Sequence, residues 1–345
     1  MAEIIVESSY GSIWRDLMEG ITWFAGERRA GWQVHCVTTD ELPRAIRSRP
    51  AGVICVLRDA QGELIRRLLE ARVPAVNLLR EVHPRIGCVM SDNRLIGARA
   101  AEHLQGQGFA HFRFVGVERA YSAEREEGFC GRLRELGRAA QVCPVKPEVE
   151  EIRAVRRAVV ERRLAAWLRT LPRPVAVCAC ADFVARMVLE CCRQAKLAVP
   201  QEVAVVGVDN DLAICELATP PLSSVPQNLR RIGFEAARLL EGMMARRRRP
   251  RAPVLVPPLE MVVRRSSDFV AMEDPRLAAA LRQLRSGDPR RMSVAAVVRE
   301  AGVSRQWLDR QFRARLGATP SELIRQRRLA AARVMLLETH LPVET

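Results

Sequence analysis

Residues 1–225 alternate between short apolar runs and longer amphipathic stretches, and this alternation strongly limits the folds open to the chain. The runs are apolar on every residue rather than on alternate residues, which is typical of strands buried on both faces of a sheet. Such strands separated by helices predict an α/β fold, with a parallel sheet covered by helices. The apolar runs are Ile4–Val6, Val34–Val37, Gly52–Leu57, Ala75–Leu79, Phe112–Val117, Val175–Ala181 and Val203–Val208. The amphipathic stretches are Ser12–Arg29, Asn93–Gln107, Ile152–Thr170 and Asp182–Leu197.

This pattern continues to about Asp268, which is long for one doubly wound sheet. Two lobes of about 110–130 residues each fit domain sizes better. We therefore expect lobes at 1–110 and 112–225, with the chain crossing back at about 226–268.

Three features exclude secreted, membrane and zinc-ribbon proteins. The chain has no run of 18 apolar residues that would predict a membrane span. Its start, MAEIIVESSY, contains an acid and lacks the basic region of a signal peptide. The ten cysteines include no C-x-x-C pair and suit free thiols in a reducing compartment. We expect a cytoplasmic protein with no membrane partner.

The net charge of +15 comes from 55 basic and 40 acidic residues, and it is unevenly distributed. Residues 271–345 hold 14 basic and 8 acidic residues, so this tail is more basic per residue than the rest. A basic module indicates a polyanionic partner, usually nucleic acid. The alternative is that an arginine-rich composition raises the charge everywhere.

Polar side chains follow several of the predicted strands. In open α/β sheets, ligands bind at the carboxyl ends of the strands. Carboxylates can accept hydrogen bonds from adjacent hydroxyls, and an aromatic ring can pack on a sugar's C–H face. An acid at a strand end is also a common helix N-cap, and this alternative applies to Asp92 and Asp182. The candidate ligand-binding residues are Tyr10, Asp92, Tyr121, Asp182 and Asp209.

Residues 1–268 resemble the type I periplasmic binding protein fold, as used in the ligand domains of the lactose-repressor family. The matching pieces are SDNRLIGARAAEHLQGQGF, SAEREEGF, CACADFVARMVLECCRQAKLAVPQEVAVVGVDND and PPLSSVPQNLRRIGFEAARLL. The resemblance implies a sugar bound between two lobes, with Arg125 and Asp209 contacting it. The family's asparagine-aspartate pair is Ala181-Asp182 here, so only Asp182 carries over. That family has an N-terminal DNA-binding headpiece, whereas this chain starts at its first strand, so we expect DNA contacts elsewhere.

The tail contains a helix-turn-helix pattern. A first helix, Arg276–Arg285, carries Leu277, Leu281 and Leu284 on one stripe. A second helix begins at Met292-Ser293-Val294 with Ser293 as its cap and ends at a turn in which Gly302 supplies a left-handed position.

Ser304 is expected to cap the next helix, Arg305–Arg315, with Leu308 and Phe312 facing inward. Arginine reads guanine edges and glutamine reads adenine edges in the major groove, so the outward face of this helix predicts DNA recognition. The alternative is a three-helix packing module with a solvated basic face. The candidate DNA-binding residues are Ser304, Arg305, Gln306, Asp309, Arg310 and Arg313.

Residues 274–345 resemble the DNA-binding domain of the AraC family of regulators. The matching features are the serine-capped helix, the L-x-x-x-F pair, the L-G-x-x-P turn at Leu316–Pro320 and the helix from Arg328, which has the R-x-x-x-A-x-x-L-L pattern with Met335 at the first leucine position. A binding-protein-like domain followed by an AraC-type tail resembles the xylose operon regulators of that family. The family carries two helix-turn-helix units, whereas the expected linking helix ends here near Glu338. Either the protein is truncated or it works with one unit.

The resemblance implies a regulator that binds xylose or a related sugar and alters DNA binding at paired half-sites as a homodimer. One alternative is a sugar sensor whose tail no longer reads DNA. Another is a sugar-modifying enzyme, which we do not expect because the sequence holds no phosphate loop, G-x-G-x-x-G, H-E-x-x-H or G-x-S-x-G motif. We expect no cofactor and no metal.

Overall fold

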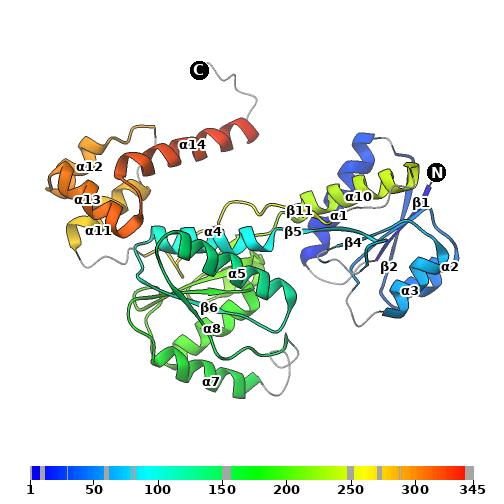
Figure 1. Ribbon diagram of the computed structural model, residues 1–345, viewed down its shortest axis with the longest axis horizontal. Coiled ribbons are helices and arrows are strands. Elements are labelled where there is room, and N and C mark those ends of the chain that lie inside the picture. Colours follow the sequence, from blue (N-terminus) through cyan, green and yellow to red (C-terminus); the bar gives the residue numbers. More distant parts are fainter. Residues whose placement is uncertain are drawn as a thin grey trace. The chain divides into compact units, whose positions relative to one another are not determined.

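The computed structural model describes most of the 345-residue chain (Figure 1). The chain divides into two compact units, Met1–Ile96 with Val225–Glu260, and Gly97–Ser224 with Met261–Thr345. The described residues are 2–7, 12–28, 30–57, 62–78, 80, 83–149, 157–246, 252–269, 274–286, 288 and 290–338.

The first unit is built on a six-stranded sheet in the order β11-β5-β4-β3-β1-β2. The pairs between neighbouring strands are parallel, as the apolar runs predict. The strands are β1 (Ala2–Glu7), β2 (Trp32–Val37), β3 (Gly52–Cys55), β4 (Ala75–Leu78), β5 (Gly87–Ser91) and β11 (Val254–Val256). The helices are α1 (Ser12–Arg28), α2 (Leu42–Arg47), α3 (Gly62–Ala71), α10 (Leu229–Arg246) and the start of α4 (Asn93–Gly106).

Two glycines let α1 and α10 pack backbone against backbone over one core of this unit. A Cβ on Gly20 would lie 1.9 Å from the carbonyl oxygen of Arg230, and one on Gly233 would lie 2.0 Å from that of Leu17. Only glycine leaves room for so close a crossing. The core beneath includes Ile4, Ile54 and other fully buried side chains.

The second unit contains a five-stranded sheet in the order β10-β9-β8-β6-β7. β6, β7, β8 and β9 pair in parallel, so their carboxyl ends lie along one edge. The strands are β6 (His111–Val115), β7 (Ala140–Val142), β8 (Val175–Ala179), β9 (Val203–Asp209) and β10 (Ser223–Pro226). The helices are the rest of α4, α5 (Ala120–Glu135), α7 (Arg157–Arg169), α8 (Asp182–Gln194) and α9 (Leu212–Leu217).

The parallel α/β architecture predicted from the sequence is confirmed. The apolar runs given above do not include β5, nor the three short strands β7, β10 and β11. β7 and β11 have three residues each, and β10 is the serine-rich segment SSVP, so none of them has the continuous apolar run of a central strand. The helix predicted at Ile152–Thr170 is described as α7 over Arg157–Arg169, and residues 150–156 lie outside the described part of the chain.

The tail forms four helices with a hydrophobic core of their own: α11 (Pro275–Ser286), α12 (Val294–Ala301), α13 (Arg305–Leu316) and α14 (Pro320–Glu338). The predicted stripe of Leu277, Leu281 and Leu284 is buried. α14 is described as far as Glu338, and residues 339–345, expected to approach a second unit, lie outside the described residues.

The predicted caps of the helix-turn-helix are also confirmed. The hydroxyl of Ser293 accepts a hydrogen bond from the backbone N–H of Ala296, and Gly302 has a φ of 65°. The hydroxyl of Ser304 accepts from the N–H of Trp307. These caps fix where α12 ends and where α13 begins, which sets the turn between them.

Two further observations concern the helices and the cysteines. Among the helices that the structure describes, none is long and apolar enough to cross a membrane. All ten cysteines are free thiols.

Candidate ligand site and DNA-reading helix

Three predicted ligand residues meet at the carboxyl edge of the five-stranded sheet. Arg125, on α5, is 4% exposed, and its Nη1 donates to the carbonyl oxygen of Cys180 over 2.6 Å and to Oδ1 of Asp209 over 3.4 Å. Its guanidinium also lies over the ring of Tyr121, 5.0 Å from the ring centre. Asp209 ends β9 and keeps 23% of its side chain exposed. A buried cation thus lies beside a carboxylate that solutes can reach.

The Tyr121 hydroxyl belongs to the same edge. Burial raises the pKa of this phenol, so it stays protonated at neutral pH and keeps a hydrogen to donate. A neutral hydroxyl, a guanidinium and a carboxylate together supply donors and acceptors for a polyol.

The backbone at this edge is strained. Asp209 has a φ of 111° and Asn210 a φ of 54°, in the region that L-residues other than glycine rarely adopt. Such conformations persist only where surrounding contacts impose them, and they cluster at functional sites.

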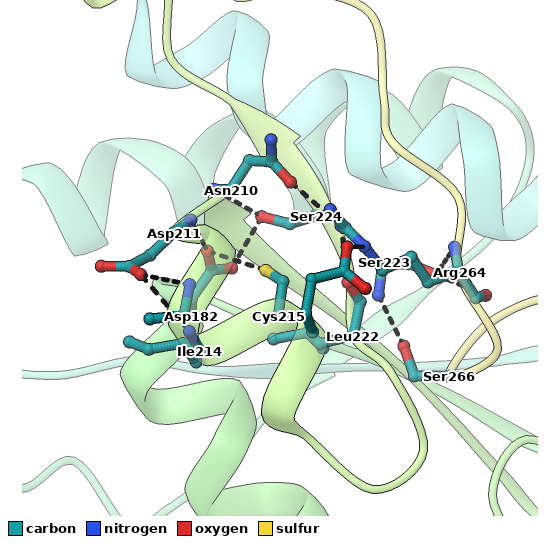
Figure 2. A network of polar contacts seen from close by, with 12 residues as sticks. Asp182, Asn210, Asp211, Ile214, Cys215, Leu222, Ser223, Ser224, Arg264 and Ser266 are labelled. Carbon is teal, nitrogen blue, oxygen red and sulfur yellow. Dashed lines mark hydrogen bonds and ion pairs between the residues drawn. The ribbon is translucent and has the colours of Figure 1, made fainter. Parts of the chain in front are cut away.

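Asp182, predicted to contact the ligand or to cap a helix, lies at the centre of a buried network (Figure 2). Its Oδ1 accepts from the hydroxyl of Ser224 over 2.6 Å. Its Oδ2 accepts from the backbone N–H of Asp211 over 2.8 Å and from the thiol of Cys215 over 3.3 Å. Asp182 is the first residue of α8 rather than its cap, and its bonds reach three other segments of the chain. It therefore fixes the turn that follows β9.

The electrostatics of Asp182 reflect this burial. Burial, and then the charge of nearby Asp209, raises the pKa of Asp182 to about 7, against the hydrogen bonds that lower it. Gly207 makes room for the carboxylate, because a Cβ there would lie 2.2 Å from Oδ1 of Asp182. The glycine of the V-V-G-V-D piece is thus explained by packing.

Of the remaining two candidates, one belongs to the first unit and one lies outside the described residues. Asp92 lies in the first unit, where its Oδ1 accepts from the N–H of Leu95, so the alternative of a cap on α4 describes this carboxylate. Tyr10 lies outside the described residues.

The candidates chosen from the sequence lack several members of the network, among them Cys215, Ser224 and Arg264. They come from segments up to 82 positions away from Asp182 in the sequence, so spacing gave no signal. The available signal was compositional: the Ser223-Ser224 and Ser266-Ser267 pairs are fully buried. Buried hydroxyls need partners, and here they tie segments together.

In α13, the predicted outward residues Arg305, Gln306, Arg310 and Arg313 are exposed. Leu308 and Phe312 are fully buried, as predicted. Asp309 is half-buried, with its Oδ2 3.9 Å from Nε of Arg305 and its Oδ1 buried without a hydrogen bond among the described residues. The exposed face of α13 is therefore polar, basic and free of large apolar groups.

Two family models match the chain. The periplasmic binding protein-like domain matches residues 101–267, and a helix-turn-helix domain matches residues 297–345. Together with the fold, these matches define the class of protein: the chain joins a periplasmic binding protein-like domain to a helix-turn-helix domain.

Within this class, the chain is similar to the xylose operon regulatory proteins. It is 28% identical to that of Escherichia coli strain K12, over 95% of this chain and 85% of the relative. It is 29% identical to that of Haemophilus influenzae, over 76% and 68%. A solved structure titled as xylose-binding transcription activator xylR matches with a TM-score of 0.68 and 27% identity, over 99% of this chain and 89% of that chain.

Proposed function

We propose that the protein is a sugar-responsive regulator, in which a pentose such as xylose, or a related sugar, binds at Tyr121, Arg125 and Asp209 and alters DNA binding by α13. The names of its relatives support xylose as the first sugar to test. The regulator would act in the cytoplasm, as a homodimer on paired half-sites.

The observation that carries the proposal is the pairing of buried Arg125 with exposed Asp209 at the carboxyl end of the sheet. One sugar hydroxyl can donate to the carboxylate, while the oxygen of its neighbour accepts from the guanidinium. Charge-assisted hydrogen bonds are short and directional, so the pair discriminates hydroxyl orientations. The Tyr121 ring adds an apolar surface for the sugar's C–H groups.

Asp182 has a supporting role in this proposal, because Oδ1 already accepts from Ser224 of β10 and Oδ2 already accepts from Asp211 and Cys215. Tyr10 and Asp92 remain predictions as ligand contacts. On the DNA side, Arg310 and Gln306 would reach base edges, whereas Ser304, Arg305 and Arg313 would meet phosphates. Asp309 would orient Arg305, since their side chains lie 3.9 Å apart.

Calorimetry with a panel of pentoses tests the sugar site. Asp209→Ala should weaken binding of the best ligand about ten- to a hundredfold, because a charged acceptor is lost. Asp40→Ala, an exposed acid in the first unit, is the matched control and should bind like the wild type. Equal affinity of Asp209→Ala and the wild type would overturn the assignment.

A further inference from the structure

Residues 261–269, called the strap here, are hydrogen-bonded to β9 and β10 of the five-stranded sheet. Val262 forms an antiparallel bridge with Ser224 of β10. The carbonyl oxygen of Ser266 accepts from the N–H of Val205 in β9 over 2.8 Å, and its hydroxyl donates to the carbonyl of the same residue over 2.6 Å. Ser266 and Ser267 are fully buried. The strap is therefore held against β9 and would move with it, although its polar sequence, RRSSD, is typical of a linker.

Arg264 connects the strap to the ligand edge (Figure 2). Its Nη1 donates to Oδ1 of Asn210 over 2.9 Å and to the carbonyl oxygen of Leu222 over 3.0 Å, and its Nε donates to Glu216 over 2.6 Å. Its own backbone N–H and carbonyl both bond the hydroxyl of Ser223. The side chain is only 10% exposed.

The contact with Asn210 matters because Asn210 directly follows Asp209. Both residues are in left-handed backbone conformations. These conformations cost free energy and persist only where surrounding contacts impose them. The backbone N–H of Asn210 donates to Ser224, and its side chain accepts from Arg264. Together with Ser224 and the bond from Asp211 to Asp182, Arg264 thus holds the turn carrying the ligand aspartate.

The other end of the strap leads toward the DNA-binding domain. Its last described residues are Asp268 and Phe269, and α11 begins at Pro275. The strap also contacts the region of α4, where Ser267 bonds the ring of His103 over 2.9 Å and Phe269 packs on Phe109. A shift of the turn at Asp209 would therefore pass through Arg264 to the strap, which comes before α11 in the sequence.

We propose that Arg264 is a positioning residue that holds the Asp209-Asn210 turn in its ligand-binding shape and couples sugar occupancy to the strap. This inference rests on the proposed function. The ion pair with Glu216 contributes little, because Glu216 is 59% exposed and such pairs are screened by solvent. The contacts to Asn210 and Leu222 carry the role.

The test uses the full chain and three variants. Arg264→Gln removes the ionic donor, and Arg264→Lys keeps the charge but cannot reach several acceptors in one plane. Arg265→Gln changes the same charge on the neighbouring exposed residue and is the matched control. Calorimetry with D-xylose, L-arabinose and D-ribose gives the sugar affinity. DNA affinity with and without saturating sugar gives the coupling factor, the ratio of the two.

Arg264→Gln should weaken sugar binding about ten- to a hundredfold and bring the coupling factor close to one. Arg264→Lys should fall between Arg264→Gln and the wild type, and Arg265→Gln should match the wild type in both measures. A purely structural role would lower sugar affinity but leave the coupling factor at saturation unchanged. An unchanged coupling factor would therefore overturn the proposal.

Hydrogen exchange separates this inference from the proposed function. Without sugar, Arg264→Gln should speed amide exchange at residues 207–211 and 262–267 together, whereas Arg265→Gln should not. If exchange rises while the wild type binds none of the sugars, Arg264 does hold the two segments together. The sugar assignment is then wrong, and so is the coupling of the strap to sugar. If exchange is unchanged in both segments, Arg264 does not hold the Asp209-Asn210 turn to the strap.

Discussion

Nη1 of Arg125 lies 3.4 Å from Oδ1 of Asp209, and the arginine is buried while the aspartate is partly exposed. A much shorter contact, 2.6 Å, anchors the same nitrogen to the carbonyl oxygen of Cys180. The cation is therefore fixed by the sheet edge, and the looser contact leaves the carboxylate able to engage a solute. This division of roles is the basis of the sugar site proposed above.

Replacing Arg125 with lysine should lower sugar affinity by about tenfold or more. A lysine ammonium cannot present several donors in one plane to Cys180, Asp209 and a hydroxyl. Isothermal calorimetry measures the loss, and thermal unfolding monitors whether the variant is folded. A folded Arg125→Lys protein with wild-type affinity would show that the guanidinium does not contact the sugar.

Asp182 should make stability fall as the pH rises toward neutrality. Its pKa in the folded protein is about 7, above the value of 3.8 for a free aspartate. The folded state thus holds a proton that the unfolded state releases, so this contribution is fully present below about pH 4 and is lost as pH rises through 7. Each unit of pKa difference is worth about 1.4 kcal/mol.

The measurement is urea unfolding of the wild type and Asp182→Asn across this pH range. Asp182→Asn should be less stable overall, because the amide nitrogen cannot accept from Asp211 and Cys215, yet its stability should decline less between pH 4 and 7. Parallel pH profiles for the two proteins would show that Asp182 does not titrate in this range.

Gly207→Ala should destabilise the second unit by about 1–3 kcal/mol, because the added methyl group would overlap the Asp182 carboxylate. Gly131→Ala is the control, since a Cβ there meets nothing within 4 Å and the residue lies inside α5. Helix propensity predicts that this change stabilises by up to about 1 kcal/mol. If both substitutions shift the denaturation midpoint alike, the packing account of Gly207 is wrong.

Two arginines on α13 should affect DNA binding differently. Arg310→Ala should cost about 1–3 kcal/mol on a preferred duplex and relax its sequence preference. Arg313→Ala should weaken the binding of all duplexes alike. It should also reduce the slope of log K against log salt concentration by about one. Fluorescence titrations of preferred and random duplexes at two salt concentrations distinguish the two roles. Identical behaviour of the two variants would contradict this assignment of base and phosphate contacts.

The fold was predictable where local sequence decides it. The central strands are apolar on both faces, and Ser293, Gly302 and Ser304 have the ordinary chemistry of helix ends. The short strands β7, β10 and β11 depend on neighbours that lie far away in the sequence, so their own residues give little signal.

The site was predictable in part for a related reason. Strand-end position identified Tyr121 and Asp209, and the family resemblance identified Arg125. The structure brings these three residues together. The same rule selected Asp92 and Asp182 without revealing whether each carboxylate faces a helix end, a buried hydroxyl or a ligand. That choice depends on Leu95 in one case and on Ser224 in the other, and only the folded chain supplies these partners.

The most direct test of sugar-responsive DNA binding is to select duplexes from a random-sequence pool with the full chain, with and without D-xylose. The selected duplexes are then titrated under both conditions. The account predicts a specific sequence whose affinity changes at least several-fold with the sugar, and a change that Asp209→Ala abolishes. Recovery of a specific sequence whose affinity is the same with every pentose, or no enrichment at all, would contradict it.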